Sequence, residues 1–424
     1  MHETLAASLP LLKILLSFVA MLVLIRFRLP LGLAILGGSA LLGLFFGLAP
    51  TEWIATVAAA PFKEKPLHLT AIIALIMALS RLLEESGQTR RLMRSIAGVL
   101  TSPRLRMAFF ASLIGLLPMP GGAIFSAPMV AGAAEGLDVR PERLALINYW
   151  FRHIWELGWP LYPGVILASS LAGMPITGLI SLTLPAVLLS LVLGWLFFLR
   201  PGVLPLPRLA AVADEPFRPR ELFREGLPLL VAIGGAVAME VGISVLRPDL
   251  PFEVGMCVAL ALAIVCTLLQ NTGGLVLLLR TLVSKSFLTM LAVIVGIFAY
   301  QDVLHATGAV ARIAELTGGG AALALTAGLL PFLVGTVTGI TLAYVGTTFP
   351  LILTMAAQTG TDPIACVVLG LFCGYAGLIV SPLHICLVLT CEYFHTDLAP
   401  VWRSLVLPGA ILIATGYLYY FLLI

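Results

Sequence analysis

The chain has 424 residues, of which 60% are hydrophobic and only 11% are charged, and its formal net charge is +3. A soluble domain usually carries about 25% charged residues, so a surface this poor in charge must largely face lipid rather than water. Because no basic patch interleaved with aromatic residues occurs, nucleic acid is not expected as a partner.

Ten runs of the chain are predicted to cross a bilayer, because a spanning helix needs about 20 mainly apolar residues. In chain order these spans cover 8–26, 31–48, 67–83, 143–168, 176–199, 226–246, 252–270, 286–304, 362–394 and 398–422. The first run is interpreted as a true span rather than a cleavable signal, since Lys13 interrupts it. Residues 88–101 and 309–316 are expected to form short amphipathic helices along the interface.

Two further apolar stretches, at about 106–134 and 321–357, are interrupted by Pro and Gly and are predicted to be re-entrant hairpins. After the Pro-Gly-Gly turn of the first, a new helix presents free backbone N–H groups that suit an anion. In the second, threonine hydroxyls and glycine backbone offer oxygen ligands for a substrate or Na⁺. The alternatives are a Pro-Gly kink in an ordinary span and threonines that bond to their own helix. The predicted substrate-binding residues are Pro120, Gly121, Gly122, Ser126, Gly335, Thr336, Thr338, Gly339, Thr347 and Thr348.

A long helix broken at a proline follows each hairpin, and ionisable residues lie beside both breaks. The first helix carries Arg152, His153 and Glu156, and the second carries His384. Charged side chains deep in a membrane are costly and are functional candidates by default. His153 and Glu156 are expected to share a helical face, and Arg152 to reach Glu156 one turn later. We predict that these four residues couple transport to an ion gradient; the alternatives are a structural Arg–Glu pair and a histidine satisfied in the core.

The residue types that mark soluble enzymes and metal sites are not arranged in their usual motifs. The six cysteines all lie in apolar stretches of the second half, and they form neither a C-x-x-C pair nor a zinc spacing. They are expected to be small buried hydrophobic residues, and no metal site or cofactor is predicted. The motifs H-E-x-x-H and G-x-S-x-G and the Walker loop do not occur. The protein is therefore expected to be neither an enzyme nor an ATP-driven pump, and Na⁺ enters only as a coupling ion.

The two halves of the chain look alike. Pro160 and Pro382 lie 222 residues apart at matching helix breaks, and the tetrapeptide Gly-Leu-Leu-Pro occurs in both predicted hairpins. Five spans in each half are an odd number, so the second half must be inverted in the membrane. The predicted fold is an all-α polytopic membrane protein with ten transmembrane helices and two re-entrant hairpins in two inverted repeats. The repeats are residues 1–200 and 225–424, joined by a Pro-rich, charged cytoplasmic linker at 201–224.

This pattern resembles the ion transporter superfamily, which includes dicarboxylate, citrate and gluconate carriers built from two inverted five-span repeats. The motifs PMPGGAIFSAPMV, RHIWELGWPLYPG and SPLHICLVLTCEYF look more closely like a prokaryotic integral membrane family catalogued as domain of unknown function four hundred and one. The superfamily resemblance implies an elevator motion of the hairpin domain against a homodimeric scaffold. The dicarboxylate carriers have Ser-Asn-Thr at both hairpin tips, where this chain has Pro-Gly-Gly and Thr-Val-Thr. Neither Na⁺ coupling nor dicarboxylate specificity is therefore carried over.

The sequence thus predicts a secondary active transporter of a small organic anion, coupled to a proton or sodium gradient in the cell inner membrane. Its expected partners are the anionic substrate, the lipid bilayer and a second copy of the chain. Two other classes stay open. One is a flippase for a lipid-linked anion, and the other is an intramembrane enzyme with His153 and Glu156 as base and acid. The lack of a recognisable nucleophile or metal set counts against the enzyme.

Both termini are predicted to face outside, and residues 201–224 to face the cytoplasm. In this orientation 18 of the 24 Lys and Arg residues lie on the cytoplasmic side and four lie outside, which follows the positive-inside rule. A single cysteine placed at Ala211, in a chain lacking the native cysteines, should react with an impermeant maleimide only after cells are permeabilised. Labelling of that cysteine from outside intact cells would contradict the orientation.

Overall fold

The computed structural model describes residues 2–27, 29–97, 100, 102–117, 122–206, 217–247, 250–271, 274–308 and 320–424. All the regular elements in these ranges are helices, and six of them are long and apolar enough to cross a membrane, judged by length and composition. Shorter apolar helices of 10–17 residues lie among them. The chain is thus an all-helical, multi-span membrane protein.

Many of the helices begin at a proline, whose missing N–H costs no hydrogen bond in the first turn. The first half of the chain forms α1 (His2–Arg26), α2 (Leu31–Phe46), α3 (Pro50–Ala59), the 3₁₀ turn η1 (Ala60–Phe62), α4 (Glu64–Glu85), α5 (Gln88–Ala97), α6 (Pro103–Gly115), α7 (Ala123–Ala133), α8 (Pro141–His153), α9 (Pro163–Ala172), α10 (Ile176–Gly194) and the π-helical η2 (Trp195–Leu199). The second half forms α11 (Pro219–Leu246), α12 (Phe252–Gln270), α13 (Gly274–Leu282), α14 (Lys285–Ala306), α16 (Gly320–Thr338), α17 (Thr341–Thr359), α18 (Pro363–Ile379), α19 (Ile385–Tyr393) and α20 (Leu398–Leu423).

The predicted spans agree with these helices. Each of the ten falls on one helix or, at 143–168 and 362–394, on two helices separated by a break. Each stretch predicted as a hairpin also contains two helices, α6 and α7 in the first and α16 and α17 in the second. The sequence did not predict α3 and α13, because both are too short to span a membrane. The predicted interfacial helix at 309–316 and most of the predicted linker, 207–216, lie outside the described residues. The number of crossings, the repeat boundaries and the orientation stay predictions.

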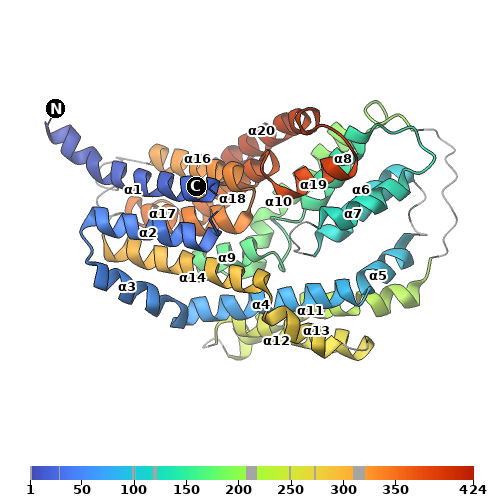
Figure 1. The fold of residues 1–424 in the computed structure, drawn as a ribbon, viewed down its shortest axis with the longest axis horizontal. Coiled ribbons are helices and arrows are strands. Elements are labelled where there is room, and N and C mark those ends of the chain that lie inside the picture. The colour runs from blue at the N-terminus through green and yellow to red at the C-terminus, as the bar shows by residue number, and fades with distance from the viewer. Residues whose placement is uncertain are drawn as a thin grey trace.

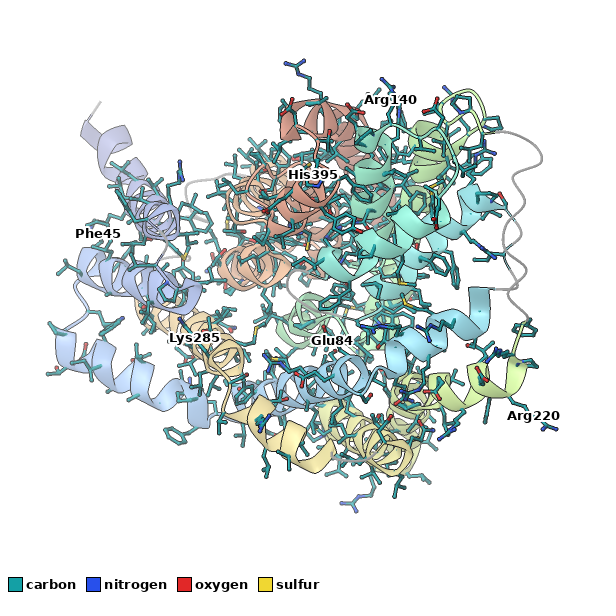
Figure 2. The ribbon with its side chains drawn as sticks, turned by 45° about the vertical axis from the view of Figure 1, so that its right-hand side comes forward. Phe45, Glu84, Arg140, Arg220, Lys285 and His395 are labelled. Atoms are coloured by element: carbon teal, nitrogen blue, oxygen red, sulfur yellow. The ribbon has the colours of Figure 1, made fainter. Side chains whose placement is uncertain are left out.

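By their packing the helices can be divided into two groups, each built from both halves of the chain. One group contains α1–α5 and α11–α14, in which α2 packs on α14 and α4 packs on α12. The other contains α6–α10 and α16–α20, in which α6 packs on α8 and α16 packs on α18. Figure 1 shows α4 and α11–α13 along one edge of the molecule and α16 and α20 toward the opposite edge. In Figure 2 Glu84 of α4 lies between the groups, and Arg220 of α11 projects from the molecular edge.

Within the second group, helices of each half of the chain pack on helices of the other half. Helix α7 of the first half packs on α19, and helix α17 of the second half packs on α9. Matching prolines occupy matching places: Pro128 and Pro350 lie inside α7 and α17, and Pro185 and Pro408 lie inside α10 and α20. This packing between the halves places the break in each long helix beside helices of the other half.

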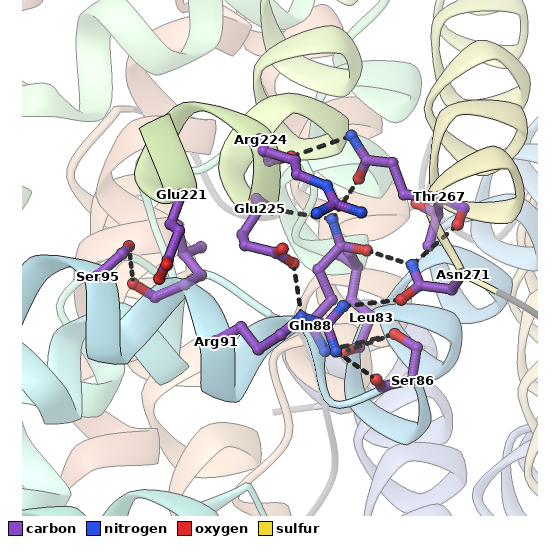
Figure 3. Close-up of polar contacts among 12 residues, drawn as sticks. Leu83, Ser86, Gln88, Arg91, Ser95, Glu221, Arg224, Glu225, Thr267 and Asn271 are labelled. Carbon is purple, nitrogen blue, oxygen red and sulfur yellow. Dashed lines mark hydrogen bonds and ion pairs between the residues drawn. The ribbon is translucent and has the colours of Figure 1, made fainter. Parts of the chain in front are cut away.

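A network of hydrogen bonds connects the start of α5 to helices of the second half of the chain (Figure 3). Arg91 donates from Nε to Glu225 Oε2 at 2.9 Å and from Nη2 to Asn271 Oδ1 at 2.7 Å. The buried amide of Gln88 donates to the Glu225 carbonyl oxygen at 3.1 Å and to Gln270 Oε1 at 2.6 Å. Since buried polar groups need partners, these bonds hold α5 against α11 and α12.

Replacing Glu225 by alanine should lower the thermal stability, because Arg91 would lose a charged acceptor beside buried polar groups. Hydrogen bonds to charged groups contribute about 1.5–3 kcal/mol, and the loss should lie in that range. Glu221 is the matched control on the same helix: it pairs with Arg218 at 3.0 Å, with side chains 51% and 56% exposed. Glu221→Ala should cost less than about 1 kcal/mol. Equal losses in thermal unfolding of the purified variants would show that the network does not stabilise the joint.

Candidate functional site

Two interrupted helices meet in the second group. Residues 154–162 separate α8 from α9, and residues 380–384 separate α18 from α19. Pro160 and Pro382 lie in these breaks, where proline's fixed φ and missing N–H prevent a helix from continuing. Both breaks are predicted from these prolines, and in the structure each proline lies within its break, although the first break begins well before Pro160.

Tyrosines from the opposite half bind the buried carbonyl groups at each break, in addition to the N–H groups of Glu156 and Ser381 that bond to His153 and Leu378. Tyr149 of α8 donates its hydroxyl to the carbonyl oxygens of Leu378 at 3.3 Å and Ile379 at 3.1 Å. Tyr375 of α18 donates its hydroxyl to the carbonyl oxygen of His153 at 3.1 Å. This reciprocal capping holds the last turn of α8 against the last turn of α18.

Arg152, His153 and His384 form a buried cluster at this junction, with exposed fractions of 3%, 0% and 5%. Arg152 Nη1 lies 3.1 Å from His153 Nε2, and His153 Nδ1 lies 2.6 Å from the Tyr149 carbonyl oxygen. Because arginine only donates and a carbonyl only accepts, His153 carries its proton on Nδ1. His384 Nε2 lies 3.1 Å from the same His153 Nε2. The three predicted ion-coupling residues are therefore in direct contact.

Glu156, the fourth predicted ion-coupling residue, reaches the site from a turn. Glu156 was expected to lie on the same helical face as His153, and this expectation is wrong because helix α8 already ends at His153. The break therefore begins earlier in the chain than the position of Pro160 suggests. The Glu156 side chain is buried and accepts a hydrogen bond from the Thr341 hydroxyl at the start of α17. A contact between the two halves thus supports this carboxylate.

A cavity of about 270 Å³ opens at the junction. Its polar wall contains Arg152, Glu156, Thr341, His384 and Cys386, which come from both halves of the chain. The rest of its lining is mostly apolar: Tyr162, Pro163, Gly164, Met290, Gly339, Ile340, Leu342, Leu378 and Ile385. Such a mainly apolar cavity with a few convergent polar groups is typical of a small-molecule site.

A glycine from each predicted hairpin tip packs directly against a residue of this cluster. Pro120 and Gly121 lie outside the described residues, but Gly122 packs so closely on Arg152 that a Cβ there would lie 2.4 Å from Nη2. Gly339 has a φ of +63° and packs on His384, where a Cβ would lie 3.0 Å from the histidine Cβ. A larger residue at either position would displace the charged or polar group behind it.

The other predicted binding residues lie away from this cavity. The hydroxyls of Thr336, Thr338, Thr347 and Thr348 each donate to a carbonyl oxygen four residues earlier in their own helix, and Ser126 also bonds within α7. A Cβ at Gly335 would lie 2.4 Å from the Gly374 carbonyl oxygen, so this glycine allows α16 to pack on α18. Their substrate contacts stay predictions.

The sequence reading missed three residues of the site. Cys386 was expected to be only a small buried hydrophobic residue, Thr341 was left out of the predicted threonine cluster, and Tyr149 was given no role. The signal for Cys386 was its spacing, since it follows His384 by two residues directly after the Pro382 break. Thr341 and Tyr149 act across the two halves, which local spacing does not reveal.

A second cavity, of about 660 Å³, lies between the two helix groups. Its lining combines Glu84, Arg90 and Arg94 of α4 and α5 with Ile124 and Phe125 of α7. This charged cavity lies along α7, the helix whose N-cap residue Gly122 packs on Arg152.

The family described as "Protein of unknown function (DUF401)" matches residues 8–423. None of the curated proteins compared with the chain matches it. Among solved structures, the chain is similar to the YdaH transporter of Alcanivorax borkumensis, with 18% sequence identity and a TM-score of 0.60. The similarity covers 88% of each chain. At that identity the likeness shows a shared fold.

Thr341→Val should destabilise the protein, because a buried carboxylate would lose its hydroxyl donor while the side-chain shape is kept. An unsatisfied buried polar group costs about 1–3 kcal/mol, more for a charged group. Thr347→Val, in the same helix, removes a buried hydroxyl that bonds only to the Ala343 carbonyl oxygen of its own helix, and it should be nearly neutral. Thermal unfolding of both variants measures the difference, and an equal effect would show that the bond to Glu156 adds nothing.

Proposed function

The chain belongs to the DUF401 family, as its sequence resemblance predicted, and we propose that it is a secondary active transporter of a small organic anion. The substrate occupies the cavity between the two helix breaks, and a proton or sodium gradient drives its uptake. The fold shared with a protein described as a transporter supports this proposal.

The observation that carries the proposal is the buried guanidinium of Arg152 in the wall of this cavity. Little water screens this buried charge, so the guanidinium attracts an anion strongly in addition to its contact with His153. Arginine also binds a carboxylate through two parallel N–H groups, which selects an anion by geometry as well as by charge. An anion that enters the cavity therefore gains a strong partner there.

The apolar part of the cavity favours an organic substrate over an inorganic ion. Side chains such as Met290, Ile340, Leu342 and Ile385 offer no hydrogen bonds, and they suit a hydrocarbon body attached to the anionic group. A volume of about 270 Å³ accommodates a small molecule rather than a lipid chain, which favours transport of a free acid over the flippase alternative.

The pair formed by Glu156 and Thr341 supports the coupling step. A carboxylate and a hydroxyl offer oxygen atoms that bind either a proton or a dehydrated Na⁺. Because Glu156 and Arg152 share one cavity, a cation on Glu156 offsets the negative charge that the substrate brings. Loading of the cation and the anion is thereby linked by charge.

Gly122→Val should strongly reduce uptake of organic acids by proteoliposomes. The added side chain would displace the Arg152 guanidinium, and loss of one charge-assisted hydrogen bond of about 1.5–3 kcal/mol corresponds to roughly tenfold weaker binding or more. Gly132→Val on the same helix is the control, since a Cβ at Gly132 meets open space. No uptake of any radiolabelled short organic acid by the wild type, or normal uptake by Gly122→Val, would contradict the proposal.

Glu156→Gln should separate binding from coupling. The amide keeps the shape and can still accept from Thr341, but it can neither carry a proton nor bind Na⁺ as a charged ligand. The variant should still exchange substrate across the membrane and should lose uphill accumulation driven by a pH or Na⁺ gradient. Accumulation that survives unchanged would make Glu156 structural.

A further inference from the structure

A cluster of potential metal ligands lies where the two broken helices meet. The ligand atoms of His153, His384 and Cys386 all lie within 4.8 Å of one another, and all three residues are buried. We propose that these side chains bind a transition-metal ion of the Zn²⁺ class, with a fourth coordination position that opens into the cavity. Neither the family nor the transport proposal assigns such a site.

The ligand atoms are near enough to form a metal centre after small movements, since none lies more than 4.8 Å from another. In tetrahedral zinc sites the metal lies about 2.0–2.1 Å from nitrogen and about 2.3 Å from sulfur, which separates neighbouring ligand atoms by roughly 3.3–3.6 Å. The two histidine Nε2 atoms are 3.1 Å apart. A small outward shift of the two rings therefore admits an ion between them. Two imidazoles and one thiolate are ligands that Zn²⁺ and neighbouring transition metals favour over Mg²⁺ or Ca²⁺.

The surroundings of His153 already match those of a metal ligand. Its Nδ1 donates to the Tyr149 carbonyl oxygen at 2.6 Å, which orients the ring and leaves the Nε2 lone pair facing the cluster. Histidine ligands in metal sites usually donate their second nitrogen to a carbonyl or carboxylate in this way. His384 Nδ1 has no hydrogen-bond partner in the described part of the chain, so the proton that Nε2 now shares with His153 can move to Nδ1; the bond between the two histidines is then given up to the ion.

The charged neighbours of the cluster are Arg152 and Glu156. An incoming ion takes the lone pair of His153 Nε2 that Arg152 Nη1 now contacts at 3.1 Å, so the guanidinium must turn away from that nitrogen. A divalent ion and Arg152 together carry three positive charges, and the Cys386 thiolate and the Glu156 carboxylate carry two negative charges. One net positive charge is therefore left in the site. An anionic ligand in the fourth position would neutralise it, and Cys386, His384 and Arg152 all line the cavity that such a ligand would occupy.

Cobalt(II) is the probe for this site, because it adopts zinc geometries and a thiolate bound to it gives an intense near-ultraviolet charge-transfer band. Purified, chelator-treated protein in detergent should develop that band on titration with CoCl₂, together with visible bands of a tetrahedral ion, and should saturate at one equivalent. Cys386→Ser should abolish the charge-transfer band. His384→Gln should weaken Co²⁺ binding by more than the about 10–100-fold that loss of a supporting outer-shell partner causes.

Cys391→Ser is the matched control, because Cys391 is also buried in α19 but lies outside the cluster. This variant should keep the full band. No charge-transfer band in the wild type, or a band that survives Cys386→Ser, would overturn the proposal. If Cys386→Ser does not fold, X-ray absorption on the zinc-loaded wild type decides: one sulfur at about 2.3 Å supports the site, and a shell of nitrogen and oxygen alone refutes it. Because binding is measured without transport, failure here leaves the transport proposal standing.

Discussion

Backbone carbonyl groups left bare where a helix stops inside a membrane must find partners, since lipid offers none. In this protein tyrosines of the other half add to the bonds of the local turns: Tyr149 binds the carbonyls at the end of α18, and Tyr375 binds the carbonyl at the end of α8. The two breaks therefore stabilise one another. As a result the residues at the ends of α8 and α18 lie together, and the buried site forms around them.

Further bonds between the halves lie at the same place. Asn148 of α8 donates to the Thr390 hydroxyl of α19 at 3.0 Å, and Thr341 of α17 donates to Glu156 beside α8. These bonds follow from the packing of α7 on α19 and of α17 on α9. A displacement of α6–α7 or of α16–α17 relative to the other half would therefore change the walls of the cavity directly, as the proposed transport cycle requires.

Hydropathy and proline positions predicted the long helices and both breaks, because length, apolarity and loss of an N–H act within a single segment. Placing Arg152, His153 and His384 in one site was also within reach, since each lies beside a break. The threonines were harder, because sequence alone does not separate a hydroxyl free for a ligand from one that bonds to its own helix, as Thr347 does. Thr341 and Cys386 gain their neighbours only through contacts between the halves.

The site is asymmetric even though the halves match. At the separation of 222 residues that relates Pro160 to Pro382, Arg152 corresponds to Gly374 and His384 corresponds to Tyr162. The first half thus supplies the formal charges, Arg152 and Glu156, and the second half supplies the neutral polar groups around them. A substrate that lay on an axis between the halves would meet a charge on one side only. An anion bound in the proposed site would therefore lie closer to Arg152 on α8 than to α18.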